Sequence, residues 1–384
     1  MSKIKLLWVV YDFVQAGGQR YVYEICKALD KEKYEIDILK VSPLNADKNW
    51  ADEHYYQPTL DLGCKVYFLQ KILKETTKKK TLFQRGTNKI KRKIGLNISK
   101  SKGESEVIDH FFSNYKYVNF SGISVYHTLC ISRGLQPKNG LINILTARFQ
   151  GVDIYKGYDR NLSYNFISGF DPDILRNELS EFTNFNHTYF PLSLDTKTFE
   201  VPSKNKKKLI IGVFTRLSTM KPLDPYFYAL KLLIEQGVDV QLHIYGAGDP
   251  KEIGLTRQLE YLYLTEHIVF CGHTDSIKNT LIEENLDLVW FQSANSQLAG
   301  YAAFEIALGA VPQVLWDFNY LNTLSEVTNY FKSFTNLTQF VAYSKELLLS
   351  KEKLIALGLK QQAFVIDNHS VEKNISILER RYDN

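Results

Sequence analysis

Short apolar runs separated by polar, helix-like stretches recur along this chain in two series, and this alternation restricts it to α/β architectures. The first series consists of Ile4 to Val10, Tyr34 to Val41, Val66 to Leu69, Ile123 to Tyr126, Leu141 to Leu145 and Tyr164 to Ile167. Between the first two runs, Gln19 to Leu29 places its apolar residues on one helical face. Runs that are apolar on both faces are typical of a parallel sheet covered on both sides. The first series therefore predicts one α/β domain over residues 1–190.

A second series follows a polar stretch. Residues 191–208 contain Pro202, Ser203 and three consecutive lysines but no apolar periodicity, which predicts an interdomain linker. Runs at Leu209 to Phe214, Val238 to Tyr245, His267 to Phe270, Leu286 to Phe291 and Val311 to Leu315 then alternate with helical stretches at intervals of about 25 residues. We expect a second doubly wound domain over 209–369, and a final helix over 370–384 that can pack back toward the first. Because such sheets bind ligands beyond the carboxyl ends of their strands, two facing edges predict a central cleft.

The totals fit two globular domains. The chain has 384 residues, 45% of them hydrophobic, whereas single cores rarely grow past roughly 300 residues. A formal net charge of +5 is too small to indicate nucleic-acid binding. The four cysteines lack metal-ligand spacing and three lie in apolar runs, so we expect buried free thiols in a reducing compartment. No apolar run approaches the roughly 20 residues of a transmembrane helix, which predicts a cytoplasmic protein.

Two groups of residues at strand ends have the chemistry of phosphate binding. Gly17 and Gly18 open a helix after the first strand, where backbone N–H groups favour an anion, although an ordinary tight turn is the alternative. Neither a dinucleotide fingerprint nor a P-loop is present. After the first strand of the second domain stand Arg216 and Lys221, a planar donor fork and a compact charge that suit a diphosphate. In isolation, two such cations are more often solvated surface residues.

A third element changes that balance. It is the sequence Gln297-Leu-Ala-Gly300-Tyr-Ala-Ala-Phe-Glu305, which follows the strand ending at Phe291. Here the chain resembles the retaining glycosyltransferases of family 4, whose E-x7-E motif has glycine at its fourth position and precedes a strand rich in Pro and Val. Gly300, Glu305 and the Val311-Pro312 pair match this pattern, and the Arg-x4-Lys pair stands upstream as the family has it. The turns at Gly246 and Gly272 resemble the family's intervening landmarks, so the resemblance covers nearly the whole chain.

The resemblance implies a GT-B fold, with two Rossmann-like doubly wound domains facing a central cleft. It assigns the donor diphosphate to Arg216 and Lys221 as catalytic residues, with Gly17 and Gly18 approaching from the first domain on closure. The remaining donor-binding residues that it implies are Gly246, Gly272, His273, Gln297, Gly300, Tyr301 and Glu305, of which Glu305 would bind the ribose hydroxyls. The substrate would be a nucleotide diphosphate sugar, with UDP favoured, and no cofactor is implied.

The sequence departs from the family pattern at two positions. Gln297 replaces the first glutamate of the motif, which changes either the strength of sugar binding or the sugar preferred. Gln150 stands where the family usually has histidine, so a side-chain base is missing there. Acceptor-side candidates are therefore Gln150, Asp153 and His127, the last expected at a strand end but more often a structural histidine. No carboxylate or histidine cluster has ligand spacing, and Asp171-Pro-Asp173 has the pattern of a helix start, so we predict no metal.

A basic tract extends from Lys71 to Lys102, with twelve Lys and Arg against the single acid Glu75. Cations interleaved with apolar residues can lie on an anionic membrane surface, or form a solvated loop. We interpret the tract as a means of reaching a lipid-linked acceptor at the inner face of the membrane. The sequence as a whole predicts a hexosyltransferase-type enzyme of polysaccharide or glycoconjugate synthesis. The alternative is a degenerate, non-catalytic GT-B protein that binds a glycan or a partner.

Overall fold

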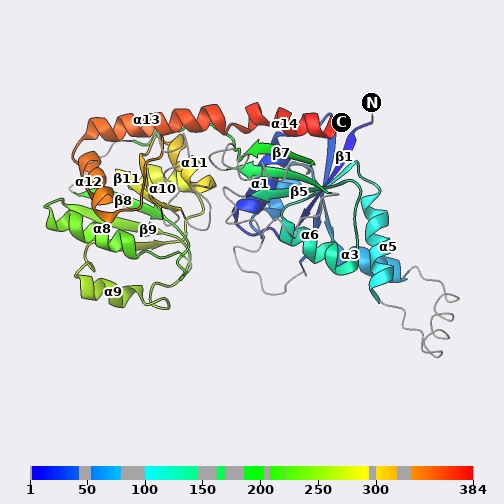
Figure 1. Cartoon of the computed structure of the whole chain (residues 1–384), viewed down its shortest axis with the longest axis horizontal. Coiled ribbons are helices and arrows are strands. Elements are labelled where there is room, and N and C mark those ends of the chain that lie inside the picture. The colour runs from blue at the N-terminus through cyan, green and yellow to red at the C-terminus, as the bar shows by residue number, and fades with distance from the viewer. Residues whose placement is uncertain are drawn as a thin grey trace.

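Both series of apolar runs form parallel sheets in the computed structural model, which describes residues 2–42, 53–78, 100–145, 162–168, 186–202, 208–219, 221–293, 300–317 and 330–383. Figure 1 shows the two sheets side by side, each flanked by helices, with α13 (Lys351–Asn368) and α14 (Val371–Asp383) running along both. Each sheet with its helices is one α/β domain.

The N-terminal sheet has the strand order β3-β2-β1-β4-β5-β6-β7, and all neighbouring strands are parallel. Its strands are β1 (Ile4–Val10), β2 (Tyr34–Lys40), β3 (Lys65–Phe68), β4 (Tyr117–Phe120), β5 (Gly140–Leu145), β6 (Ser163–Ser168) and β7 (Asn186–Pro191). Its helices are α1 (Gly17–Ala28), α2 (Tyr56–Asp61), α3 (Leu69–Lys78), α5 (Lys100–Phe112), α6 (Ile123–Leu129) and the 3-10 turn η1 (Ile131–Arg133). The chain moves outward from β1 to β3 and then returns to β4, so the strand order reverses between β1 and β4.

One expected strand is wrong. Residues 123–126 lie in α6, and the strand that pairs with β1 is β4, just before them. The Ser-Gly step at 121–122 ends the strand, and Cys130 N–H then donates to the carbonyl oxygen of Tyr126 at 2.7 Å, as a helix requires. The branched residues Ile123 and Val125 gave the segment a strand-like composition. Its buried residues Val125, Tyr126 and Leu129 nevertheless follow a helical period.

The C-terminal sheet repeats the design with the order β10-β9-β8-β11-β12-β13. Its strands are β8 (Leu209–Phe214), β9 (Val240–Tyr245), β10 (Ile268–Gly272), β11 (Leu288–Ser293), β12 (Gln313–Asp317) and β13 (Ser333–Phe334). The helices are α8 (Asp224–Glu235), α9 (Leu255–Leu262), α10 (Ile277–Glu284), α11 (Tyr301–Leu308) and α12 (Leu337–Leu348), followed by α13. The strand order reverses between β8 and β11. Ligand sites of open α/β sheets lie at such switch points, beyond the carboxyl ends of the strands.

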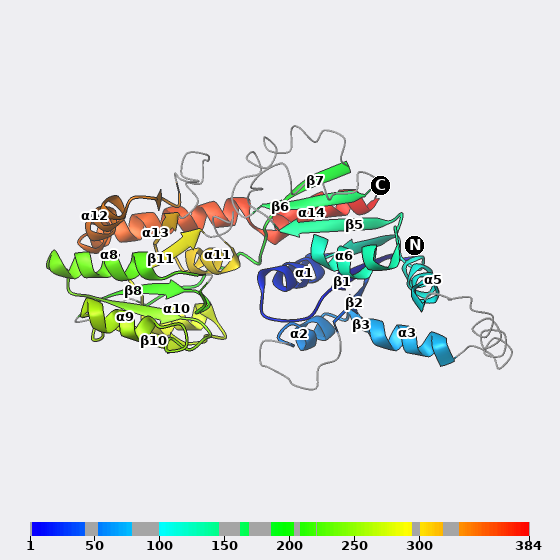
Figure 2. The ribbon, with the colours of Figure 1, turned by 60° about the horizontal axis from the view of Figure 1, so that its bottom comes forward.

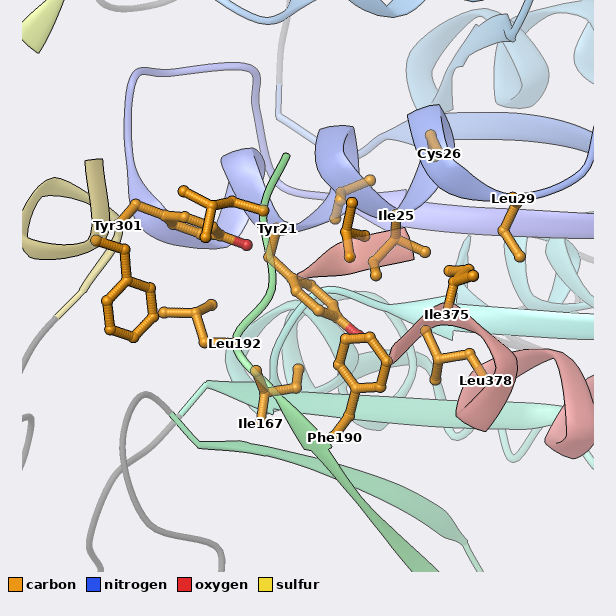
Figure 3. Packing of buried hydrophobic residues seen from close by; sticks show 14 of the residues in the cluster. Tyr21, Ile25, Cys26, Leu29, Ile167, Phe190, Leu192, Tyr301, Ile375 and Leu378 are labelled. Atoms are coloured by element: carbon orange, nitrogen blue, oxygen red, sulfur yellow. The ribbon is translucent and has the colours of Figure 1, made fainter. Parts of the chain in front are cut away.

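A continuous hydrophobic cluster joins the two domains. Figure 3 shows Tyr21 and Ile25 of α1 facing Ile375 and Leu378 of α14, with Tyr301 of α11 at the far end of the same cluster. The backbone between the sheets takes part, because Leu194 N–H donates to the carbonyl oxygen of His369 at 3.0 Å. At the other end of α14, the buried Tyr382 hydroxyl donates to Asn119 Oδ1 at 2.9 Å. The C-terminal helix is therefore part of the N-terminal domain's core.

All four cysteines lie among the described residues. Cys26, Cys64 and Cys130 are buried free thiols, but the expectation fails for Cys271, which is exposed near the end of β10. The strand is at the edge of its sheet, so this position reaches the surface. No helix among these residues is long and apolar enough to cross a membrane.

Candidate functional site

A cleft of about 480 Å³ lies between the two domains, at the carboxyl ends of both sheets. It is bounded by the loop after β1, the loops after β8, β9 and β10, and the start of α11. The lining residues are Gln15, Ala16, Gly17, Arg20, Tyr23, Glu24, His54, Tyr55, Phe214, Thr215, Arg216, Tyr245, Gly246, Ala247, His273, Thr274, Asp275, Ser276, Ile277, Tyr301, Ala302 and Glu305. Both switch points therefore open into the same cavity.

Three helices begin at this cleft. Gly17 starts α1, Ile277 starts α10 and Tyr301 starts α11, and all three residues line the cavity. The residues preceding α1 and α11 provide no side-chain cap, so the first N–H groups of these helices remain available as donors. Helix N-termini carry a partial positive charge, and their convergence favours an anion.

Arg216 and Lys221 lie together beside this region. Arg216 is exposed and lines the cleft, whereas Lys221 is half-buried and does not line it. Partial burial lowers the pKa of Lys221, and the nearby positive charge of Arg216 lowers it further. An anion bound beside the pair would relieve this repulsion, because opposite charge favours the ammonium form.

The cleft wall next to Arg216 requires a glycine at position 246. A Cβ placed on Gly246 would lie 1.7 Å from the carbonyl oxygen of Thr215, so any other residue would push the loops after β8 and β9 apart. The Gly246 N–H donates to the carbonyl oxygen of Gly272 at 2.7 Å, which holds the neighbouring loop in place. Gly272 has a φ of 76°, a left-handed conformation that favours glycine. These two glycines shape the cleft wall through close backbone packing.

An ion pair crosses the cleft from one domain to the other. Arg20 of α1 places Nη2 2.8 Å from Oε1 of Glu305 on α11, and its guanidinium lies 4.7 Å from the ring centre of Tyr301. Figures 1 and 2 both show α1 and α11 facing each other between the sheets. Burial alone would lower the pKa of Arg20, but the charge and hydrogen bond of Glu305 outweigh burial and raise it. Arg20 also lies 3.4 Å from Glu24, whose pKa is raised by burial.

Aromatic and imidazole groups complete the cavity. Tyr301 is buried and its hydroxyl donates to the carbonyl oxygen of Ser193 at 3.2 Å. His273 lies 3.3 Å from Asp275, Nε2 to Oδ1. Burial lowers the pKa of His54, with the Asp275 charge opposing. Burial also raises the pKa of Tyr55 to about 12, so its hydroxyl remains a donor at neutral pH.

The cleft thus brings together six of the residues proposed from sequence, namely Gly17, Arg216, Gly246, His273, Tyr301 and Glu305. Gly18, Gly272 and Gly300 lie next to lining residues without lining the cavity themselves. Gln297, Gln150 and Asp153 lie outside the described residues, as do Asp171 and Asp173. Among the described residues, no group of three or more His, Cys, Asp or Glu is placed to hold a metal ion.

The predicted position of His127 at a strand end is wrong. It was expected at the end of a strand, where it would face the ligand edge, but it is exposed on α6 and does not line the cleft. Its position follows from the helix that replaces the expected strand. The buried face of α6 consists of Val125, Tyr126 and Leu129, and His127 lies outside that face. His127 therefore has no place in the candidate site.

Known structures share this architecture. A TarM variant from S. aureus, solved with fondaparinux, alpha-GlcNAc-glycerol and UDP, is 13% identical over 100% of both chains, with a TM-score of 0.70. The pneumococcal O-GlcNAc transferase GtfA, in complex with UDP and GlcNAc, is 10% identical over 100% of this chain and 99% of its own, with a TM-score of 0.68. HepE from Anabaena, with UDP and glucose, is 11% identical over 99% of each chain, with a TM-score of 0.66. The chain has the GT-B fold. No protein-family model and no curated protein matches the sequence.

In this GT-B fold, several cleft residues were not found by sequence reasoning. Arg20, Glu24, His54 and Tyr55 belong to no recognised motif, and they meet the C-terminal domain only in three dimensions. One signal was present for Arg20, because it stands in the first turn after the Gly17-Gly18 pair. Side chains on a helix point back toward its N-terminus, so a cation in the first turn lies close to a ligand bound at that end.

Proposed function

We propose that this chain is a retaining glycosyltransferase that transfers a hexosyl-type sugar from a nucleotide diphosphate donor to a glycan or lipid-linked acceptor. The observation that carries the proposal is the convergence of Arg216 with three helix N-termini on one interdomain cleft of a GT-B fold. This arrangement suits a diphosphate, which needs several donors at once. UDP is the favoured nucleotide because the three similar structures described above were solved with it.

The phosphates are proposed to bind Arg216 on the side of the C-terminal domain. Lys221, whose ammonium is close enough to Arg216 for the two charges to interact, is proposed to add positive charge on the same side. The N-terminus of α1 at Gly17 faces the same space from the other domain. Closure of the domains would bring these donors onto the leaving diphosphate and expel water from the reacting centre.

The ribose is assigned to Glu305. Its Oε1 is engaged by Arg20, and a carboxylate has a second oxygen with lone pairs for the ribose hydroxyls. Arg20 therefore orients Glu305 without occupying both of its oxygens. Gln297 would contact the sugar hydroxyls with an amide in place of a carboxylate. A neutral hydrogen bond is weaker than a charged one by about 1 kcal/mol, which is roughly fivefold in affinity.

The transfer step needs no side-chain base in this proposal. The bond between the anomeric carbon and the diphosphate oxygen breaks, and a bond to the acceptor hydroxyl oxygen forms on the same face of the sugar. The departing phosphate oxygen accepts the acceptor's proton. Gln150 in the place of histidine is compatible with this route, and the cations at Arg216 and Lys221 stabilise the developing charge.

The acceptor proposal includes a membrane surface. It rests on the sequence of the basic tract, of which the described parts are the end of α3 at Lys78 and the start of α5 at Lys100. Each Lys or Arg near an anionic membrane surface contributes about 1 kcal/mol to the free energy of binding to that surface. Replacing Lys78, Lys79 and Lys80 together with Gln should weaken cosedimentation with phosphatidylserine vesicles at least tenfold, with phosphatidylcholine vesicles as the control. Unchanged sedimentation would remove the membrane from the proposal.

The central test measures nucleotide release from UDP-, GDP-, dTDP- and ADP-sugars, with and without a membrane extract as the acceptor source. We expect one donor to be used, and Arg216→Ala to lower its release at least about 100-fold, because a donor group for the leaving oxyanion is lost. The matched control is Arg257→Ala, which removes an exposed arginine of α9 in the same domain that contacts only Tyr261 among the described residues.

Two outcomes would contradict the proposal. Full turnover of Arg216→Ala at limiting donor would show that the cation is not part of the leaving-group site. Folded wild-type protein that binds UDP but releases nucleotide from no donor would instead assign the chain to the non-catalytic GT-B alternative.

A further inference from the structure

A second cavity lies at the opposite edge of the N-terminal sheet from the cleft. It has a volume of about 610 Å³ and opens between the amino-terminal ends of β4 to β7 and the last turns of α14. Figure 2 shows α14 lying next to β5, β6 and β7. The lining residues are Tyr117, Lys138, Asn139, Gly140, Leu141, Ser163, Asn186, His187, Thr188, Ile377, Arg380 and Arg381. None of them takes part in the donor cleft.

Arg381 is the central cation of this cavity. Its guanidinium is half-buried and donates to Thr188 Oγ1 and, at 3.4 Å, to Asn186 Oδ1, two neutral acceptors on β7. Within the described residues, no carboxylate lies within ion-pair distance of it. Burial lowers its pKa, and only the hydroxyls of Tyr382 and Tyr117 oppose this effect. The guanidinium nevertheless stays charged at neutral pH, because arginine does not deprotonate in proteins.

The rest of the lining has the same sign and polarity. Lys138 and Arg380 are exposed cations on its rim, and no Asp or Glu occurs among its described lining residues. Hydroxyl and amide groups lie beside Arg381, since Asn186 Nδ2 donates to Ser163 Oγ at 3.0 Å. Tyr117 adds an aromatic wall. A partly desolvated guanidinium without a counterion is unfavourable for folding, so a purely structural arginine at this place would be expected to have a carboxylate partner.

We propose that this cavity binds a saccharide that carries a single anionic group, with the anion on Arg381. The planar guanidinium matches a phosphate or carboxylate, with which it forms two parallel hydrogen bonds. The surrounding hydroxyl and amide groups are the partners that sugar hydroxyls require, and the volume is larger than a bare phosphate would fill. The proposed ligand combines an anionic group with a ring that carries hydroxyls. The controls below distinguish such a ligand from a free anion.

The site is separate from the donor cleft. The cleft lies at the carboxyl ends of the strands and this cavity at their amino ends, so the length of β7, about 20 Å for six residues at 3.3 Å each, lies between the two edges. Binding here should therefore be independent of UDP. The proposal goes beyond the transferase reaction, and its success or failure does not depend on whether any donor is used.

The experiment is isothermal titration of the full chain at constant ionic strength with glucose 6-phosphate, glucose and inorganic phosphate. We expect glucose 6-phosphate to bind at least tenfold more tightly than either of the others. Arg381→Gln should weaken that binding at least tenfold, because a bidentate charged contact is lost. Asn186→Ala, at an exposed position, should weaken it several-fold without disturbing the core. Arg257→Gln is the matched control and should change nothing.

Each alternative result contradicts the proposal. Equal affinity for inorganic phosphate and glucose 6-phosphate would leave a simple anion site, and equal affinity for glucose would remove the role of Arg381. Undetectable binding of glucose 6-phosphate, or binding unchanged in both Arg381→Gln and Asn186→Ala, would also exclude the site. Circular dichroism and thermal unfolding of each variant serve as the folding control, so the test does not rely on UDP binding.

Discussion

Arg20 and Arg381 are both half-buried arginines at the edge of a cavity, and their partners differ. Arg20 has Glu305 at 2.8 Å and Glu24 at 3.4 Å and lies over the ring of Tyr301. Arg381 contacts the neutral side chains of Thr188 and Asn186. Accordingly, the pKa of Arg20 is above its ordinary value and that of Arg381 is below it.

This difference distinguishes two ways of preparing a cavity for an anion. In the cleft, the charge of Arg20 is already balanced, so it holds α1 against α11 and leaves the phosphates to Arg216 and the helix N-termini. In the second cavity, no carboxylate of the described residues balances the charge of Arg381, so the proposal gives the counterion's place to a ligand. The first arrangement contributes to stability without ligand, whereas the second is expected to contribute to binding.

The largest effect on the free energy of unfolding is expected from breaking the ion pair between Arg20 and Glu305. Arg20 and Glu305 have side chains that are 20% and 27% exposed, so the pair is only partly screened by water. A double-mutant cycle with Arg20→Gln and Glu305→Gln should give a coupling energy of about 2 to 3 kcal/mol in the free energy of unfolding. Urea denaturation followed by tryptophan fluorescence measures it.

The same substitution at Arg381 is the internal comparison for that cycle. Because Arg381 is without a carboxylate among the described residues, Arg381→Gln should change the free energy of unfolding by less than about 1 kcal/mol. A coupling energy near zero for Arg20 and Glu305, or a larger loss for Arg381→Gln than for Arg20→Gln, would reverse the proposed roles of the two arginines.

Much of the fold could be predicted from the sequence because its strands are apolar on both faces. The run at Leu209–Phe214 is a strand with the predicted bounds, and Ile4–Val10 likewise, since neither competes with a helical pattern. Two kinds of element could not be predicted. β13 has only two residues and pairs with β12 through tertiary placement, and α6 carries branched residues that favour strand by composition.

The candidate site was predictable only where it follows strand ends. Gly17 and Arg216 were found because they lie in or at the end of the loops after β1 and β8, and the topology brings those loops to one cleft. Arg20, His54 and Tyr55 could not be found, because their significance lies in contacts across the domain boundary. No spacing along one chain encodes that Arg20 on α1 reaches Glu305 on α11. Arg381 was missed for a similar reason, since its cavity is formed by strand starts and the last helix.

His369 extends the comparison from the two cavities into the core. It is 2% exposed at the junction of α13 and α14, with its ring 4.1 Å from that of Phe304. Its Nδ1 lies 2.8 Å from the carbonyl oxygen of Leu192, and Nε2 has no hydrogen-bond partner among the described residues. Burial lowers its pKa to about 4, with the Leu192 carbonyl opposing. A positive charge there would lack both the carboxylates of Arg20 and the open cavity of Arg381.

The expected consequence is a loss of stability in mild acid. An unfolded histidine titrates near pH 6.5, so below that pH the unfolded state binds a proton that the folded state does not bind until about pH 4. The contribution of the neutral His369 to the free energy of unfolding is complete above about pH 6.5 and is lost as the pH falls from there toward 4. Between pH 7 and pH 5 it amounts to about 2 kcal/mol.

The measurement is urea denaturation at pH 7 and at pH 5, for the wild-type chain, for His369→Gln and for His127→Gln. Carboxylates contribute to the wild-type pH dependence as well, so the quantity to compare is the change between the two pH values in each protein. His369→Gln should reduce that change by about 2 kcal/mol, since glutamine does not titrate. His127→Gln, at an exposed position, is the control for replacing a histidine. An identical change in all three proteins would mean that His369 accepts its proton in the folded core, without a carboxylate among the described residues beside it.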